Sequence, residues 1–224
     1  MMAQPRASTI LKILQDDVAL SWLVKPKVDP FETLVITIIS QNTAGTNTEQ
    51  AFKSLSKNFE ITPEELANTE VGKIEVCLQA AGLYRSKARA IQMASKIIIE
   101  KFNGSLAPIL SLPLEDARKK LMELPGVGPK TADVVLLFAA NRPTIPVDTH
   151  VNRVSKRLGL APANGDYEAV RLSLQSVFKP EEYLAVHILL IALGRKYCKA
   201  GRPCCHHCPV YNCCPSNGLE DKHD

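Results

Sequence analysis

The stretch Leu124–Lys130 reads LPGVGPK and is the most informative part of this chain of 224 residues. Its glycines and prolines predict a tight turn between two helices. Apolar residues with helical spacing precede the turn in Glu115–Leu124, and a helix that is apolar on nearly all sides is expected over Thr131–Ala140. A glycine-rich turn that opens a helix exposes backbone N–H groups, and these suit a phosphate.

The turn ends in a primary amine, Lys130, at the expected N-terminal end of a helix. The helix dipole disfavours a cation there, so we expect the pKa of this amine to be lowered. A neutral amine is a nucleophile that can attack an electrophilic carbon. A bare turn of this type would by default carry a phosphate-binding or solvated lysine, and the neighbouring motifs are what favour catalysis.

Asp148 follows in the stretch VDTH, directly before an expected helix over Val151–Leu158. Aspartate at such a position predicts a helix N-cap. The same carboxylate can accept a proton from the lysine or from a water molecule, or stabilise positive charge on a sugar ring. The two roles do not exclude each other.

The periodicity is helical along most of the chain. Apolar residues follow the i, i+3, i+4 pattern in Phe31–Ser40, Ala88–Phe102 and Tyr183–Tyr197, and no alternating strand of useful length is present. Further helix starts are expected at Thr62-Pro63 and at Asp166. The sequence therefore predicts an all-α protein, with a boundary near residues 141–143 and an extended segment over residues 144–147.

Composition limits the class of protein. Hydrophobic residues make up 46% of the chain, enough for a core, and the net charge of +4 permits nucleic-acid binding without arguing strongly for it. No apolar run reaches the roughly 18 residues of a membrane span, and the first residues lack the apolar stretch of a signal peptide. We expect an intracellular protein of the cytoplasm or nucleoid, with a disordered tail over Ser216–Asp224.

Six of the seven cysteines fall between residues 198 and 214, which favours a metal site over a disulfide framework. Four thiolates fit a [4Fe–4S] cluster or a zinc ion, and the unequal gaps suit the cluster better. Cys204 and Cys213 each adjoin a candidate ligand, so the register is open to a shift of one. The candidate ligands, in the spacing C-x6-C-x2-C-x5-C, are Cys198, Cys205, Cys208 and Cys214. The loop is also crowded by the basic residues Arg195, Lys196, Lys199 and Arg202.

Together, LPGVGPKTA, VDTHVNRV and the cysteine tail resemble the endonuclease III family of DNA repair glycosylases, whose helix–hairpin–helix motif is followed by a glycine/proline-rich loop and an aspartate. The resemblance implies two helical domains that flank a DNA-binding cleft, with the damaged nucleotide turned out of the stack. We expect a six-helix barrel with the hairpin over residues 24–142. An iron–sulfur cluster domain is expected over residues 1–23 and 143–224.

The resemblance also implies roles for single residues. Lys130 matches the Schiff-base nucleophile and Asp148 the catalytic aspartate, and the four cysteines match the ligands of a [4Fe–4S] cluster. Gln41 matches the side chain that fills the vacated space in the duplex, and Leu83 the wedge beside the orphaned base. Pro129 departs from the family, which often has a basic residue there, and this removes one backbone N–H. Further DNA contacts are expected from Gly82, Arg85, Lys87, Gly126, Gly128 and His150.

The implied activity is that of a bifunctional enzyme, a DNA N-glycosylase for oxidised pyrimidines and an AP lyase that cuts by β-elimination. Its expected partner is double-stranded DNA with damaged bases or abasic sites, bound by a monomer that has no contact with membranes. One alternative is a mismatch-specific thymine or uracil glycosylase of the same superfamily. Another is a non-catalytic, cluster-containing DNA-binding protein, and Lys130 with Asp148 counts against it.

Overall fold

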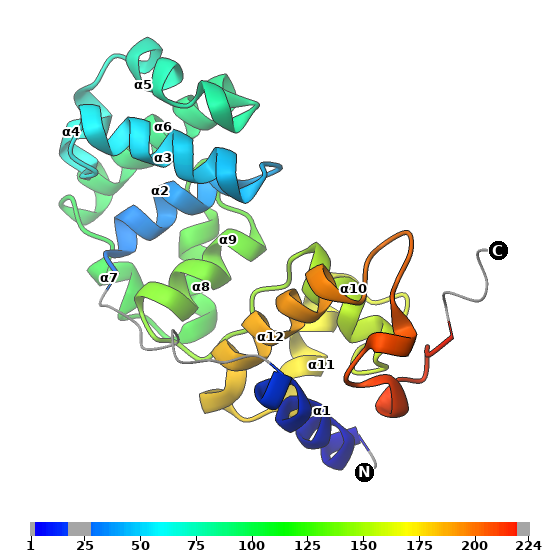
Figure 1. Cartoon of the computed structure of the whole chain (residues 1–224). Helices are drawn as coiled ribbons and strands as arrows, with labels where there is room; N and C mark the ends of the chain where they lie inside the picture. The colour runs from blue at the N-terminus through cyan, green and yellow to red at the C-terminus, as the bar shows by residue number, and fades with distance from the viewer. Residues whose placement is uncertain (1–2, 18–27, 219–224) are drawn as a thin grey trace. The chain divides into compact units, whose positions relative to one another are not determined.

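The computed structural model describes residues 3–17 and 28–218, and every regular element among them is helical, so the predicted all-α class is confirmed. The chain folds into two compact units (Figure 1). The hairpin unit is Lys27–Arg142, and the cysteine unit is Met1–Pro26 with Pro143–Asp224. The expected boundary between residues 23 and 24 lies outside the described residues, and the assignment of a barrel and a cluster domain stays a prediction.

Two helices of the hairpin unit, α2 and α4, begin at residues whose side chains cap them. The Asp29 side chain accepts hydrogen bonds from the backbone N–H groups of Phe31 and Glu32, and Thr62 accepts one from Glu65, as expected for a helix start at Thr62-Pro63. The elements of this unit are α2 (Pro30–Ser40), α3 (Gly45–Asn58), α4 (Pro63–Asn68), α5 (Val71–Cys77), η2 (Gln79–Ala81), α6 (Tyr84–Phe102), α7 (Ala107–Leu110), α8 (Leu114–Met122), α9 (Pro129–Val134) and η3 (Val135–Ala139).

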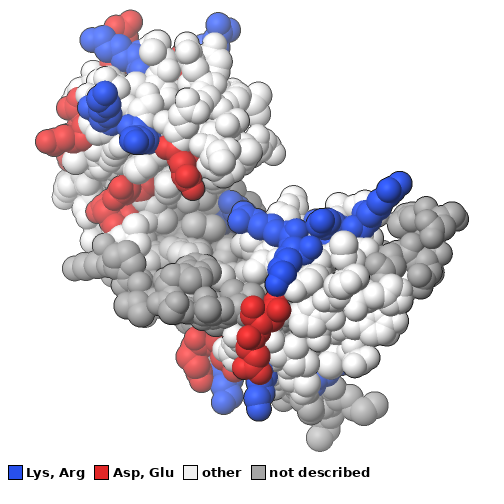
Figure 2. Space-filling view, in the orientation of Figure 1, with Lys and Arg blue, Asp and Glu red and all other residues white. Residues whose placement is uncertain are grey.

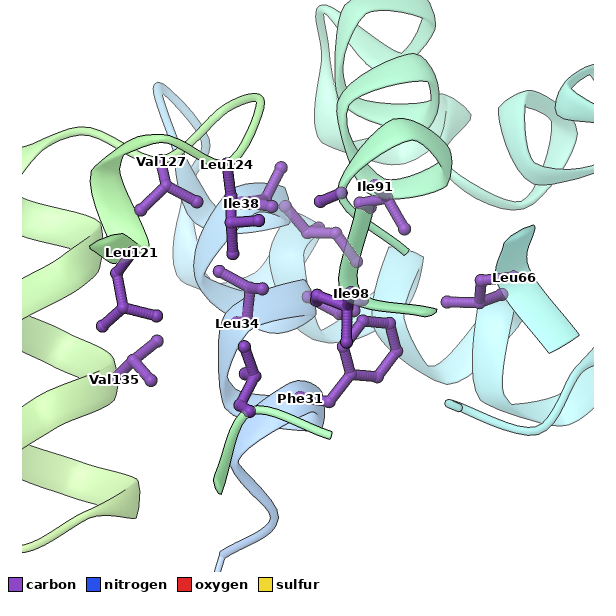
Figure 3. Close-up of a cluster of buried hydrophobic side chains, with 14 of the residues drawn as sticks. Phe31, Leu34, Ile38, Leu66, Ile91, Ile98, Leu121, Leu124, Val127 and Val135 are labelled. Carbon is purple, nitrogen blue, oxygen red and sulfur yellow. The ribbon is translucent and has the colours of Figure 1, made fainter. Parts of the chain in front are cut away.

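Helix α2 supplies the centre of the core of this unit (Figure 3). Its side chains Leu34 and Ile38 are fully buried, and α2 contacts α3, α6, α9 and η3. The turn residues Leu124 and Val127 point toward Ile38. Burial of a large aliphatic side chain contributes about 1.5–3 kcal/mol, so this packing fixes the hairpin against α2.

The helix after the hairpin starts earlier than predicted and changes its winding. It begins at Pro129, where the missing N–H of proline has no cost in the first turn, and it becomes a π-helical turn over Val135–Ala139. A buried ion pair ties this helix to α8, since Arg118 Nε lies 3.0 Å from Asp133 Oδ1. The prediction of a helix over Thr131–Ala140 is therefore confirmed, but the second half of this segment is π-helical and not α-helical.

The cysteine unit packs α12 closely on α10. A Cβ atom at Gly194 would lie 3.0 Å from the Cβ of His150, so glycine permits the close approach. Residues 144–147, before α10, are buried and belong to no helix, which is compatible with the predicted extended segment. No helix in the described ranges is long and apolar enough to cross a membrane. The elements of this unit are α1 (Ala3–Asp17), α10 (Thr149–Arg157), α11 (Tyr167–Val177), η4 (Pro180–Glu182), α12 (Tyr183–Lys196), η5 (Cys205–His207) and η6 (Tyr211–Cys213).

Candidate active site

The two glycines of the hairpin differ in what the fold requires of them. Gly126 has φ of 79°, a left-handed conformation that favours glycine. Gly128 has φ of −98°, and a Cβ atom added there would have no neighbour within 4 Å. Neither backbone conformation nor packing therefore demands glycine at position 128. Its missing side chain leaves room for the backbone of an external molecule to approach.

Lys130 is the second residue of α9 and is half-buried. The first backbone hydrogen bond of this helix runs from Ala132 N to Gly128 O, 3.0 Å away. The amine therefore belongs to the N-terminal turn, where the helix dipole favours anions. The hairpin thus combines an open backbone and a primary amine within three residues, Gly128 to Lys130.

Gln41 lies beside the hairpin although it is distant in the sequence. It forms the C-terminal cap of α2, and its Nε2 donates hydrogen bonds to Gly126 O at 2.8 Å and to Thr131 Oγ1 at 3.1 Å. The side chain is therefore neither free in solvent nor a member of the core. Thr131 was not predicted as a partner, and no local sequence signal points to it.

Leu83 has an unusual backbone and an exposed side chain. Its φ of 47° lies in the left-handed region, which is costly for a bulky residue, and 65% of its surface is exposed. The preceding Gly82 has φ of 57° and open space around its α-carbon. Arg85 is exposed and lies over the ring of Tyr84, 5.7 Å from the centroid. This turn therefore presents an apolar side chain and a cation to solvent.

Lys87 does not fit its expected role as a DNA contact. The residue is 4% exposed, and its Nζ donates hydrogen bonds to Ile39 O, Thr43 Oγ1 and Ala81 O at 2.8, 2.6 and 2.7 Å. An ammonium has three N–H donors, and all three are used inside the protein. Burial lowers the pKa of Lys87 from its ordinary value. The expectation is corrected: Lys87 holds protein segments together.

Asp148 caps α10, as the sequence predicts. Its Oδ1 accepts a hydrogen bond from Val151 N at 2.7 Å, and the side chain lines an open pocket of the cysteine unit with Asn152, Lys156 and Asp166. Lys130 belongs to the hairpin unit and Asp148 to the cysteine unit. The carboxylate is thus fixed by its cap while it borders a polar, open surface.

His150 is engaged within its own unit. Its Nδ1 lies 3.2 Å from Nη2 of Arg153. The same Nη2 donates to Gly194 O, and Nε of Arg153 donates to Cys198 O. Because the guanidinium of Arg153 can only donate, Nδ1 of His150 is the acceptor in this contact. Arg153, in contact with His150, thus joins α10 to the start of the cysteine loop.

The four candidate ligands share one pocket in the cysteine unit, and Cys204 also lines it. Burial raises the pKa of the Cys208 thiol to about 11, and the nearby thiols of Cys198, Cys214 and Cys205 raise it as well. Burial likewise raises the pKa of Cys214. Within the described residues, no three His, Cys, Asp or Glu side chains are already drawn to metal-binding distance. The thiols nevertheless meet around one space, and their donor set fits a thiolate-bound metal group.

Arg157 supports this loop and was missed in the sequence. Its guanidinium donates to Cys198 Sγ at 3.5 Å, to Lys199 O at 2.7 Å and to Ala200 O at 3.1 Å. Its own carbonyl oxygen lies 3.6 Å from Cys214 Sγ. Position 157 is distant in the sequence from every cysteine, so only the fold shows the contact.

Lys and Arg side chains form a band over the part of the cysteine unit that contains α10 and α12 (Figure 2). The sequence places a basic cluster beside the cysteine loop, and α10 ends in Lys156 and Arg157. Such a band attracts polyanions by a long-range field.

Known proteins resemble this chain over most of its length. A family model described as the HhH-GPD superfamily base excision DNA repair protein matches residues 35–180. Endonuclease III from Bacillus subtilis is 36% identical over 194 residues, which cover 87% of this chain and 84% of that protein. A structure of a non-covalent endonuclease III–DNA complex matches with a TM-score of 0.83 and 31% identity, over 99% of this chain and 100% of the other. A trapped endonuclease III–DNA covalent intermediate matches with a TM-score of 0.79 and 33% identity, over 94% and 96%.

Proposed function

The chain belongs to the HhH-GPD superfamily of base excision DNA repair proteins, and from this premise we propose that it is a bifunctional DNA glycosylase and AP lyase acting on oxidised pyrimidines. The observation that carries the proposal is the position of Lys130. Its primary amine lies in the first turn of α9, two residues after the open glycine Gly128. Backbone N–H groups at a helix start suit a DNA phosphate, so the amine would be brought to the sugar next to it.

In the proposed reaction, the neutral amine of Lys130 attacks C1′ of the damaged nucleotide and the bond from C1′ to the base breaks. The base leaves with its electron pair and a proton. The amine gives one proton to the departing base and a second to O4′ as the C1′–O4′ bond breaks, which opens the sugar ring and leaves an imine between Nζ and C1′. The imine acidifies the C2′ proton, and loss of that proton expels the 3′ phosphate by β-elimination. One lysine thus serves both base removal and strand cleavage.

Asp148 supports this reaction through its charge. As a fixed carboxylate it would stabilise positive charge that develops on the sugar ring when the base departs, and it would accept a proton from the amine or from water. The cap bond from Val151 N holds the carboxyl group in one orientation. A preoriented charge costs less reorganisation in the transition state than a mobile one.

The hairpin unit would also hold the distorted duplex. Leu83 is the proposed wedge, because it is a bulky apolar side chain held outward in a left-handed turn. Gln41 is proposed to fill the space that the extruded nucleotide leaves. Double-stranded DNA that contains a damaged base or an abasic site is therefore the proposed substrate.

Cys198, Cys205, Cys208 and Cys214 are proposed to hold a [4Fe–4S] cluster. Four thiols around one pocket, with the guanidinium of Arg157 against one sulfur, suit a metal group that carries negative thiolates. When bound, the cluster would cross-link a loop that has only short helical turns of its own. The protein residues alone would perform the reaction at the sugar.

Borohydride trapping tests the proposal, because it reduces an imine to a stable amine and joins protein to DNA. We expect a covalent adduct on a duplex with one abasic site, and no adduct with Lys130→Gln, which still binds the duplex. An adduct of equal yield in the variant would overturn the assignment of the nucleophile. A panel of duplexes with an oxidised pyrimidine, a G·T mismatch or a G·U mismatch would separate this activity from that of a mismatch glycosylase.

A further inference from the structure

Lys87 forms a buried junction at the start of α6. Its three N–H donors are taken by Ile39 O, Thr43 Oγ1 and Ala81 O, all within 2.8 Å of Nζ. A buried ammonium that loses one of these acceptors leaves a charged N–H donor without a hydrogen bond, which is strongly unfavourable. The three acceptors are therefore held near one point.

The acceptors belong to two segments that are separate in the sequence. Ile39 and Thr43 flank Gln41, and Ala81 directly precedes the turn of Gly82 and Leu83. The Thr43 hydroxyl also hydrogen-bonds to the carbonyl oxygen of Ala81, so the two segments are joined directly as well as through Lys87. The backbone N–H of Lys87 donates to Leu83 O at 3.2 Å. One lysine thus links the segment of Gln41 to the segment of Leu83.

Each segment contains a residue in the left-handed backbone region, and the conformation of Leu83 needs outside support. Asn42 has φ of 52° and Leu83 has φ of 47°, and for leucine the left-handed region is costly. The Leu83 side chain is mostly exposed, so its own packing does not offset this cost. Conformations of this kind persist only where the surroundings over-determine them. The bonds of Lys87 supply that constraint from beneath the turn.

We propose that Lys87 is a positioning residue that fixes the segments of Gln41 and Leu83 at one spacing, so that both side chains enter a damaged duplex together. The inference rests on the proposed function, since it takes these two side chains to be the ones that enter DNA. Lys87 itself touches no DNA. Lys87 therefore affects only the reaction on double-stranded DNA, in which the strand opposite the lesion must be held in place.

The experiment compares cleavage of one abasic site in a duplex with cleavage of the same site in a single strand. Lys87→Met keeps the length of the side chain and removes the N–H donors. We expect the duplex rate to fall about tenfold, because buried acceptors lose their partners and the two segments separate. The single-strand rate should change by no more than about twofold, because no orphaned base has to be held there.

Arg142→Met is the matched control. Arg142 also ties a loop of the hairpin unit, since its Nη1 donates to Leu110 O at 2.6 Å and to Leu112 O at 2.9 Å. Its removal should leave the ratio of duplex to single-strand rates unchanged. Thr43→Val is a second variant, which keeps the lysine and the shape of the side chain, and it should lower the same ratio. It decides the question if Lys87→Met does not fold.

A second readout follows the opposite strand. In a duplex with 2-aminopurine opposite an uncleavable tetrahydrofuran, unstacking of that base raises its fluorescence. We expect the parent to raise the signal on binding, and Lys87→Met, at saturation, to raise it less. Equal losses on both strand types, an unchanged ratio, or the same shift with Arg142→Met would overturn the inference. Failure of the parent itself to form an adduct with abasic DNA would instead refute the proposed function.

Discussion

Gly126 of the hairpin packs directly on Ala90 of α6, so closely that a Cβ atom at position 126 would lie 2.8 Å from the Cβ of Ala90. The contact joins the turn to the longest helix of the hairpin unit, and it needs φ of 79°, which only glycine adopts readily. Gly128 has neither constraint. Glycine at position 126 is therefore required by the fold, whereas glycine at position 128 is explained by the proposed approach of DNA.

Substitution by alanine should affect a different property at each glycine: the stability of the fold at position 126 and the affinity for DNA at position 128. Gly126→Ala should lower the free energy of unfolding by about 2–4 kcal/mol, through the left-handed backbone and the clash with Ala90. Gly128→Ala should leave stability within about 0.5 kcal/mol of the parent but weaken binding to abasic duplex about tenfold, because its methyl group occupies the proposed path of the DNA backbone. Urea denaturation and fluorescence anisotropy measure the two effects. Normal DNA binding by a folded Gly128→Ala would contradict the proposed phosphate contact.

A second prediction concerns Gln41, whose Nε2 bonds to Gly126 and Thr131 in this structure. Gln41→Ala should reduce kcat/KM on a lesion duplex about tenfold and lower stability by only about 0.5–1.5 kcal/mol, the usual worth of a hydrogen bond. Gln92→Ala is the control, because Gln92 Nε2 donates to Thr69 O at 2.7 Å in the same unit. A similar loss of activity in both variants would reduce Gln41 to a structural residue.

The helices whose apolar faces enter the core could be predicted from the sequence, and others could not. The pattern in Phe31–Ser40 is strong because α2 is buried on several sides. Helix α3 buries only Thr48, Ala51 and Leu55, and so few apolar residues give a weak signal in the sequence. The π-helical turn after α9 could not be predicted, because it depends on how the helix packs.

The place of a candidate site residue in the fold could be predicted where one motif contains it, but not where its contacts join distant residues. The hairpin placed Lys130 at a helix start, and the cap at Asp148 follows from residue type alone. Lys87 was expected to contact DNA because of the resemblance to the endonuclease III family. Its partners Ile39 and Ala81 come from other segments, and only the folded chain brings them to its amine.

A third prediction settles which cysteines bind iron, because two candidate ligands have a cysteine neighbour. Cys214 and Cys205 should each be essential, whereas Cys213→Ser and Cys204→Ser should keep the full iron content. Cys214 lines the pocket that it shares with Cys198 and Cys205, whereas Cys213 does not line it, which supports this choice. Cys204 is the sharper test, since it lines the pocket as well. Iron analysis and the visible absorption of the purified variants provide the measurement, and zinc in place of iron would contradict the cluster.

The last prediction separates the two roles of Asp148, the cap of α10 and the proposed catalyst. Asparagine caps a helix about as well as aspartate, so Asp148→Asn should keep the bond from Val151 N and change the free energy of unfolding by less than about 0.5 kcal/mol. It removes the negative charge, and turnover on a lesion duplex should fall at least about 100-fold, while the affinity for DNA is kept.

Asp166→Asn makes the same change at the other end of the pocket. Asp166 caps α11 through a bond from Ala169 N at 2.9 Å and lines the same open surface as Asp148. The Asp166→Asn variant should keep both the stability and the turnover of the parent, because no step of the proposed reaction uses the charge of Asp166. Single-turnover rates with the enzyme in excess report the chemical step apart from product release. Full turnover in Asp148→Asn would show that Asp148 serves only as a helix cap. An equal loss of turnover in both variants would show that the reaction needs negative charge in the pocket but not specifically the carboxylate of Asp148.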